Sequence, residues 1–119
     1  MLIKDNHIQV AGGIREALAR ARAYASHMTK IEIEVEDLAG VREALAGGAD
    51  VIMLDNMAPE MMREAVEVID HRAVVEASGG IDETTLAAAA AAGVDVISVG
   101  APTHRVKAPD ISMDTGRIQ

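Results

Sequence analysis

Several residue types that support common kinds of function are missing or scarce in this chain. Its 119 residues include no cysteine, tryptophan or phenylalanine, and Tyr24 is the only aromatic side chain. Without cysteine, disulfides and thiolate chemistry are excluded, and the base stacking used by single-strand-binding proteins is not expected. Basic residues are also few, 11 against 19 acidic residues, and the net charge is −8. Nucleic acid is therefore not an expected partner, because its phosphates require clustered cations.

Long apolar runs and a visible targeting signal are lacking as well. The longest apolar run is the alanine tract at residues 87–92, which is too short to span a bilayer. No basic segment is followed by an apolar stretch and a small-residue cleavage site, so we expect a cytoplasmic protein that does not contact membranes. The length suits one domain over residues 1–119, but a complete α/β barrel typically needs about 250 residues.

Five short, mostly apolar segments predict the strands of a parallel sheet. β-branched residues dominate them, as expected for strands that helices cover. Apolar residues spaced three or four apart lie between the segments and predict amphipathic helices, for example at Ile14, Leu18 and Ala21. The predicted strands span residues 2–4, 31–35, 51–54, 74–77 and 96–99.

Residues typical of helix ends agree with this division. Pro59 is expected at the first position of a helix, and Asp37 and Asn56 are candidate N-terminal caps. Gly48 and Gly93 are expected to end two helices. The five residues that begin at Gly48, Gly-Ala-Asp-Val-Ile, recur from Gly93 as Gly-Val-Asp-Val-Ile. Each copy leads from a helix into a strand, which indicates a weak internal repeat.

Repeated strand–helix units with right-handed crossovers predict a sheet that curls in one direction. The expected fold class is α/β, a partial parallel α/β barrel of the TIM type with about five βα units. Five strands leave two open edges, which proteins normally protect. We therefore expect that the chain belongs to a larger barrel or pairs with another copy as a homo-oligomer.

Polar or glycine residues follow every predicted strand, and in such barrels the active site lies at these strand ends. Together they suit a ligand with charged and hydroxyl groups. In chain order, the candidate site residues are Lys4, Asn6, His7, Glu34, Asp55, Ser78, Gly79, Gly80, Gly100 and His104.

The segment at residues 78–80 predicts a phosphate site. Glycines let the backbone approach an anion, and N–H groups at a helix start favour phosphate. Gly100 ends the next strand and would offer its amide to the same place. The alternative is that the paired glycines only make a tight turn, but glycines at two adjacent strand ends favour phosphate. His104 could bind phosphate or act as an acid.

Two carboxylates and one lysine complete the prediction. Glu34 and Asp55 end neighbouring strands and can accept hydrogen bonds from sugar hydroxyls or hold Mg²⁺, which prefers oxygen ligands. The alternative is that they cap the following helices. Lys4 falls inside the first predicted strand, where a lysine is normally avoided, so pairing with an anionic ligand or with Glu34 is expected. His7 could serve the site, or it could only hydrogen-bond within its loop.

Several strings of residues, taken in order, resemble quinolinate phosphoribosyltransferase, also called nicotinate-nucleotide pyrophosphorylase (carboxylating). The resemblance covers nearly the whole chain. The strings are MLIKDNHI at residues 1–8, IEVE at 33–36, IMLDNM at 52–57, EASGGI at 76–81, GVDVISVGA at 93–101, TH at 103–104 and DIS at 110–112.

The resemblance implies a reaction: quinolinate and phosphoribosyl pyrophosphate give nicotinate mononucleotide, pyrophosphate and CO₂, with Mg²⁺, in NAD biosynthesis. It implies that Lys4 stabilises the anionic substrates and the departing pyrophosphate. It also implies that Glu34 and Asp55 orient the ribose, and that residues 78–80 with Gly100 and His104 hold the 5′-phosphate.

This sequence departs from the family pattern in two respects. Family members are more than twice as long, with an N-terminal sandwich domain and first barrel strands that supply arginines and a histidine for the quinolinate carboxylates. In addition, Pro102 and Arg105 replace the usual residues near His104. We therefore expect the 119-residue chain alone to be inactive. The alternatives are a related pyrophosphorylase acting on another base, or a non-catalytic phosphate-binding half-barrel that self-associates.

Overall fold

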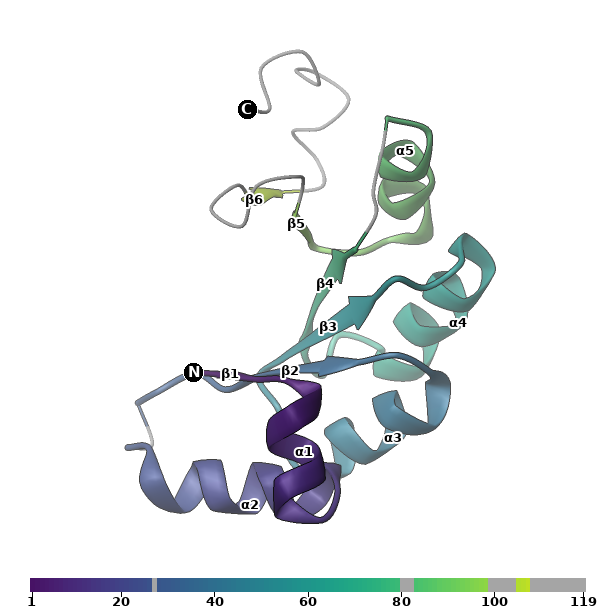
Figure 1. Ribbon diagram of the computed structural model, residues 1–119. Coiled ribbons are helices and arrows are strands. Elements are labelled where there is room, and N and C mark those ends of the chain that lie inside the picture. The colour runs from purple at the N-terminus through teal and green to yellow at the C-terminus, as the bar shows by residue number, and fades with distance from the viewer. Residues whose placement is uncertain (27, 80–82, 99–104, 108–119) are drawn as a thin grey trace.

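The computed structural model describes residues 1–26, 28–79, 83–98 and 105–107 (Figure 1). Within these ranges the strands form a single sheet in the order β1-β2-β3-β4-β5-β6. Strands β1 to β5 pair in parallel, and β6 pairs antiparallel with β5. The strands are β1 (Leu2–Ile3), β2 (Glu32–Val35), β3 (Val51–Asp55), β4 (Val74–Ser78), β5 (Val96–Ser98) and β6 (Arg105–Lys107).

Helices connect the parallel strands and lie along one side of the sheet. Figure 1 shows α2 to α5 following one another along this side, with the strands fanned out beside them. Neighbouring helices in this row contact one another. The helices are α1 (Asp5–Ala11), α2 (Ile14–Tyr24), α3 (Leu38–Ala46), α4 (Pro59–Ile69) and α5 (Glu83–Ala92). The predicted partial α/β barrel is confirmed, because consecutive parallel strands alternate with helices on one face.

The two faces of the sheet differ in composition. Every second strand residue packs against the helices and is buried, and Ile33, Ile52 and Ile97 are among those with no exposed surface. The other residues form the opposite face, which we call the inner face. It consists of Glu32, Glu34, Val51, Met53, Asp55, Val74, Glu76, Ser78, Val96 and Ser98. Most of these are half-buried or exposed, because the part of the chain that the structure describes places its helices on the other side.

The helix boundaries confirm part of the sequence prediction. Asp37 caps α3 by accepting a hydrogen bond from the Gly40 N–H at 2.8 Å, and Pro59 begins α4. Asn56 as a cap was wrong, because Ala58 is the N-terminal cap of α4 and Asn56 has a left-handed backbone with φ 55°. A turn with positive φ follows β3 and delays the helix by two residues.

Three further features differ from the prediction. Strand β1 ends at Ile3, and Lys4 is the N-cap of an additional helix, α1, where a loop was expected. Gly12, with φ 99°, ends that helix. Helix α3 takes Gly47 as its C-cap, and Gly48, with φ 81°, follows it. Strand β6 was not predicted, because three residues carry too little periodicity to indicate a strand.

The internal repeat has a structural meaning. The N–H of Asp50 donates to the Ile31 carbonyl at 2.9 Å, and the Ile31 N–H donates back to the Asp50 carboxylate at 2.8 Å. Asp95 makes the same reciprocal pair with Val75, at 2.8 and 2.9 Å. In each copy the aspartate therefore fixes the start of its strand to the start of the preceding strand.

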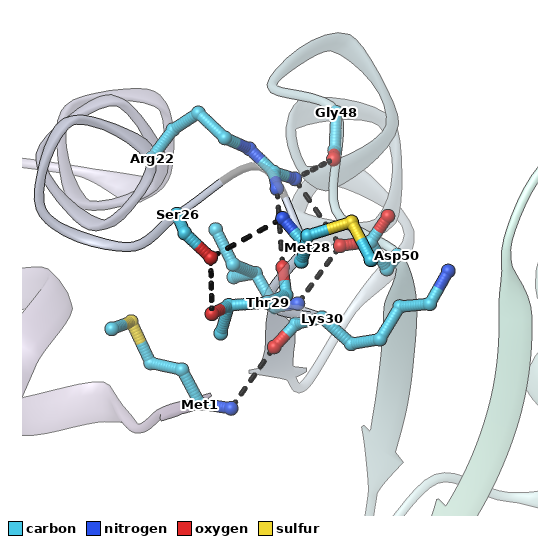
Figure 2. Close-up of polar contacts among 9 residues, drawn as sticks. Met1, Arg22, Ser26, Met28, Thr29, Lys30, Gly48 and Asp50 are labelled. Atoms are coloured by element: carbon cyan, nitrogen blue, oxygen red, sulfur yellow. Dashed lines mark hydrogen bonds and ion pairs between the residues drawn. The ribbon is translucent and has the colours of Figure 1, made fainter.

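Arg22 adds a second layer of contacts at Asp50, as Figure 2 shows. Its guanidinium donates to the Gly48 carbonyl at 2.9 Å and to the Asp50 carboxylate at 3.2 Å. Nearby, the N-terminal amine of Met1 donates to the Lys30 carbonyl at 2.9 Å. These contacts tie α2 and the N-terminus to the base of β2 and β3. No helix within the described ranges has the length and hydrophobicity needed to cross a bilayer.

Candidate functional site

The predicted site residues of β3 and β4 lie next to each other. The two strands pair through their last residues, and Asp55 is aligned with Ser78. Both side chains belong to the inner face and are half-buried. Parallel register places them at the carboxyl ends of the strands, the position of active sites in α/β barrels. A carboxylate and a hydroxyl thus lie side by side on the inner face.

Glu34 belongs to the same face on the adjacent strand. Its aligned partner is Met53, two residues before Asp55. From a strand spacing of 4.8 Å and a rise of 3.3 Å per residue, the Cα atoms of Glu34 and Asp55 are about 8 Å apart. Two half-buried carboxylates at this spacing can bind the hydroxyls of one sugar ring, or hold one cation between them through water.

Lys4 lies beside this row, but not in the environment that the sequence predicted. Register between β1 and β2 pairs Leu2 with Glu32 and Ile3 with Ile33. Continued by one residue, it places Lys4 beside Glu34. The placement of Lys4 inside the first strand was wrong: it follows the strand as the cap of α1, and it is exposed. An exposed ammonium at this position is accessible to an anionic ligand.

His7 and Asn6 take part in the first turn of α1. The Lys4 N–H donates to Nδ1 of His7 at 3.2 Å, and the His7 N–H donates to the Asn6 side-chain oxygen at 3.0 Å. Both side chains are exposed. These bonds match the alternative that His7 hydrogen-bonds within its own segment.

Position 79 requires glycine because its backbone lies close to the residue that follows β3. Its φ is 113°, and a Cβ atom at this position would lie 2.9 Å from the Asn56 nitrogen and 3.0 Å from the Asn56 Cα. The Asn56 N–H donates to the Ser78 carbonyl at 2.9 Å. Both the left-handed backbone and the closeness of Asn56 therefore require glycine. Gly80, Gly100 and His104 lie outside the described residues.

The donor set at this end of the sheet fits Mg²⁺ better than a metal that needs a closed protein cage. Among the described residues there is no group of three or more histidine, cysteine, aspartate or glutamate side chains that could hold a metal ion. Glu34 and Asp55 supply two carboxylates. Mg²⁺ is usually bound by one or two carboxylates and keeps several waters for substrate phosphates to replace.

Sequence reasoning missed two residues of the inner face, Glu76 and Ser98. Glu76 lies two residues before Ser78 on β4 and is 1% exposed. The Ser98 hydroxyl, at the end of β5, donates to its carboxylate. The signal was present as the alternation of Val74, Glu76 and Ser78 along β4, which places all three on one face. The sequence prediction treats residues 74–77 as one mostly apolar, buried strand and does not assign its residues to two faces.

A large open cavity lies away from these residues. Its volume is about 1120 Å³, and it is lined at the amino ends of β3 to β5 by Lys30, Asp50, His71, Arg72 and Asp95, among others. Asp50 and Asp95 already bind backbone N–H groups there, and Arg72 donates to the Val68 and Ile69 carbonyls at the end of α4. Asp50, Asp95 and Arg72 thus stabilise the fold at this end.

Curated proteins with similar sequences share one name. The probable nicotinate-nucleotide pyrophosphorylase [carboxylating] of Methanocaldococcus jannaschii is 47% identical over 126 residues, which cover 100% of this chain and 44% of that protein. The protein of the same name from Bacillus subtilis is 48% identical over 114 residues, covering 96% of this chain and 39% of that protein. The chain thus spans less than half the length of these relatives.

Solved structures that are similar to this chain include proteins of the same name. The nicotinate-nucleotide pyrophosphorylase from Francisella tularensis superposes with a TM-score of 0.79 at 43% identity, over 86% of this chain and 36% of that one. NadC from Streptococcus pyogenes superposes with a TM-score of 0.76 at 44% identity, over 87% of this chain and 36% of that one. The family described as "Quinolinate phosphoribosyl transferase, C-terminal domain" matches residues 1–114. The chain therefore belongs to the quinolinate phosphoribosyltransferase family, and the match is to the model of that family's C-terminal domain.

Proposed function

We propose that this chain provides the phosphoribosyl-binding side of a nicotinate-nucleotide pyrophosphorylase (carboxylating). The reaction transfers the phosphoribosyl group from phosphoribosyl pyrophosphate to quinolinate, with loss of CO₂, and forms nicotinate mononucleotide. One observation carries the proposal: Glu34, Asp55 and Ser78 lie on neighbouring strands of one face, at the strand ends, in a chain that matches the family over residues 1–114.

The proposed roles follow from the chemistry of each group. Glu34 and Asp55 accept hydrogen bonds from the ribose hydroxyls and stabilise positive charge as it develops on the ribose ring. Ser78 and the backbone around Gly79 receive the 5′-phosphate, together with Gly80, Gly100 and His104. Catalysis by such a site depends mainly on positioning and electrostatics.

Mg²⁺ is part of this proposal, with Glu34 and Asp55 as its protein ligands, directly or through water. The ion would neutralise charge on the pyrophosphate group of the substrate. The two carboxylates hold their positions because both belong to strands whose alternate residues are buried against the helices. This rigidity lets them orient a ligand with little loss of entropy on binding.

Binding of phosphoribosyl pyrophosphate to the purified chain tests the proposal. Isothermal titration in the presence of Mg²⁺ should show that Glu34→Gln and Asp55→Asn each weaken binding about tenfold, the usual effect of losing a charged hydrogen-bond acceptor. Glu64→Gln is the matched control, because Glu64 is exposed on α4. Equal affinity of all four proteins would contradict the proposal. Gly79 is unsuitable for this test, since any side chain there would displace the Asn56 backbone.

Self-association through the β1 edge is a further part of the proposal. Five of the large apolar side chains exposed in the described structure gather near this edge, namely Met1, Leu2, Val10, Tyr24 and Met28. Several of them line a groove of about 440 Å³ between β1, α1 and α2. An open sheet edge with exposed apolar groups favours contact with another chain, and we propose a second copy. A cytoplasmic location also stays a prediction.

A further inference from the structure

Glu76 is a carboxylate in a place where proteins rarely keep one. It lies in the middle of β4, on the inner face, with 1% of its surface exposed. Among the residues that the structure describes, it is the charged side chain reported as buried. Removing a carboxylate from water is costly unless other groups bind it. An apolar residue would pack here at lower cost, so the carboxylate points to a task other than packing.

The contact between Glu76 and Ser98 indicates what that task is. Ser98 is the last residue of β5, and its hydroxyl donates to the Glu76 carboxylate. Within the described residues, the ladder between β4 and β5 pairs Glu76 with Val96 and Ala77 with Ile97. The Ser98 bond therefore joins the two strands at the point where the described ladder ends.

The other side of β4 is held differently. Five residue pairs join β3 to β4, and the last of them aligns Asp55 with Ser78. The Asn56 N–H then extends this contact by donating to the Ser78 carbonyl. The end of β4 is thus fixed toward β3 by backbone bonds, and the bond from Ser98 to Glu76 adds a side-chain contact toward β5 next to the last pair of that ladder, Ala77 with Ile97.

We propose that Glu76 and Ser98 are a positioning pair that fixes the end of β4, and with it Ser78 and Gly79, for phosphate binding. The bond sets how far β5 stands from β4 directly beneath the candidate phosphate site. Neither residue needs to touch the ligand, because its effect passes through the strand. This inference rests on the proposed function, since Ser78 and Gly79 matter to a phosphate only if the site is a phosphoribosyl site.

Three variants of the full 119-residue chain test the pair with ribose 5-phosphate as the probe. Ser98→Ala removes the donor and should weaken binding about tenfold, because small displacements of binding groups are costly. Ser98→Thr keeps the hydroxyl and should restore binding to about the wild-type value. Glu76→Gln keeps an acceptor for Ser98 but removes the charge, and binding should stay close to wild type. If Glu76→Gln changes the affinity as much as Ser98→Ala does, the charge acts on the ligand and the positioning role is wrong.

Amide hydrogen exchange gives a test that does not depend on any ligand. The Asn56 N–H, bonded to the Ser78 carbonyl, reports on the carboxyl end of β4, and the Val74 N–H, bonded to the Asp50 carbonyl, reports on its amino end. Ser98→Ala should speed exchange at Asn56 about tenfold and leave Val74 unchanged, since local opening follows the loss of local bonds. Equal effects at both amides would show a merely structural role and overturn the inference. Wild-type protein that does not bind ribose 5-phosphate would contradict the proposed function, and exchange would still decide whether the pair positions β4.

Discussion

Replacing Asp50 by alanine should destabilise the fold by about 2 kcal/mol. The Asp50 carboxylate accepts the Ile31 N–H at 2.8 Å, and Ile31 has no exposed surface. Alanine leaves this buried donor without its acceptor, which costs about 1–3 kcal/mol. The ion pair with Arg22 adds little, about 0–1 kcal/mol, because the two side chains are 39% and 30% exposed. Asparagine keeps an acceptor oxygen, and we expect it to cost about 1 kcal/mol.

The acidity of Asp50 gives this prediction a pH dependence. The bond from the Ile31 N–H, and after it the Arg22 guanidinium, hold the pKa of the Asp50 carboxyl below its usual value of 3.8, although partial burial opposes them. A carboxyl whose folded pKa is lowered stabilises the fold above its unfolded pKa, and this contribution is lost as pH falls through the folded pKa. The difference between wild type and Asp50→Asn should be full above about pH 5 and should shrink below 3.8.

Urea unfolding followed by circular dichroism measures both effects. For a domain of this size, a loss of about 2 kcal/mol lowers the urea midpoint by about 1 M. Asp95→Asn is the parallel variant for comparison, because Asp95 makes the same reciprocal bonds with Val75. Arg22→Gln removes the ion pair and leaves the bond from the Ile31 N–H, so it measures the contribution of the ion pair to stability separately. If the difference between Asp50→Asn and wild type stays constant down to pH 3, the ionised carboxylate is not what stabilises this junction, and the reasoning fails.

Three further predictions concern the site and the open edge. Gly79→Ala should lower the free energy of unfolding by about 2 kcal/mol, measured by urea unfolding, because alanine disfavours φ 113° and would contact the Asn56 backbone; an unchanged midpoint would show that the turn adapts freely. Removing Mg²⁺ with EDTA should weaken binding of phosphoribosyl pyrophosphate in wild type about tenfold but have a smaller effect in Asp55→Asn, and equal losses in both would remove Asp55 from the metal site. Val10→Ser with Tyr24→Ser should shift sedimentation toward the monomer, whereas Val74→Ser, a control on β4 at 42% exposure, should not; the same distribution for all three would contradict association through the β1 edge.

Assays of nicotinate mononucleotide formation address the chain as a whole. We expect no turnover of quinolinate by the 119-residue chain, since it spans 44% and 39% of the lengths of the two curated relatives described above. Robust product formation by the purified chain would contradict this expectation and would place the groups that recognise quinolinate within these residues.

The amino-acid sequence by itself determined the succession of strands and helices. Runs rich in β-branched residues marked β2 to β5, and Asp37 and Pro59 marked two helix starts, because these signals act over a few neighbouring residues. The order of residues along each predicted strand also placed Glu34, Asp55 and Ser78 at strand ends. It misplaced Lys4 and missed α1, because a seven-residue helix depends on packing more than on its own pattern.

Only the tertiary structure decided how these residues meet. Strand register aligned Asp55 with Ser78, and the contact with the Asn56 backbone showed why residue 79 must be glycine. Burial of Glu76 and its bond from Ser98 likewise depend on two strands that lie about twenty residues apart in the chain. Pairing, burial and close approach join distant segments, and periodicity within one segment carries no record of which neighbour will lie beside it.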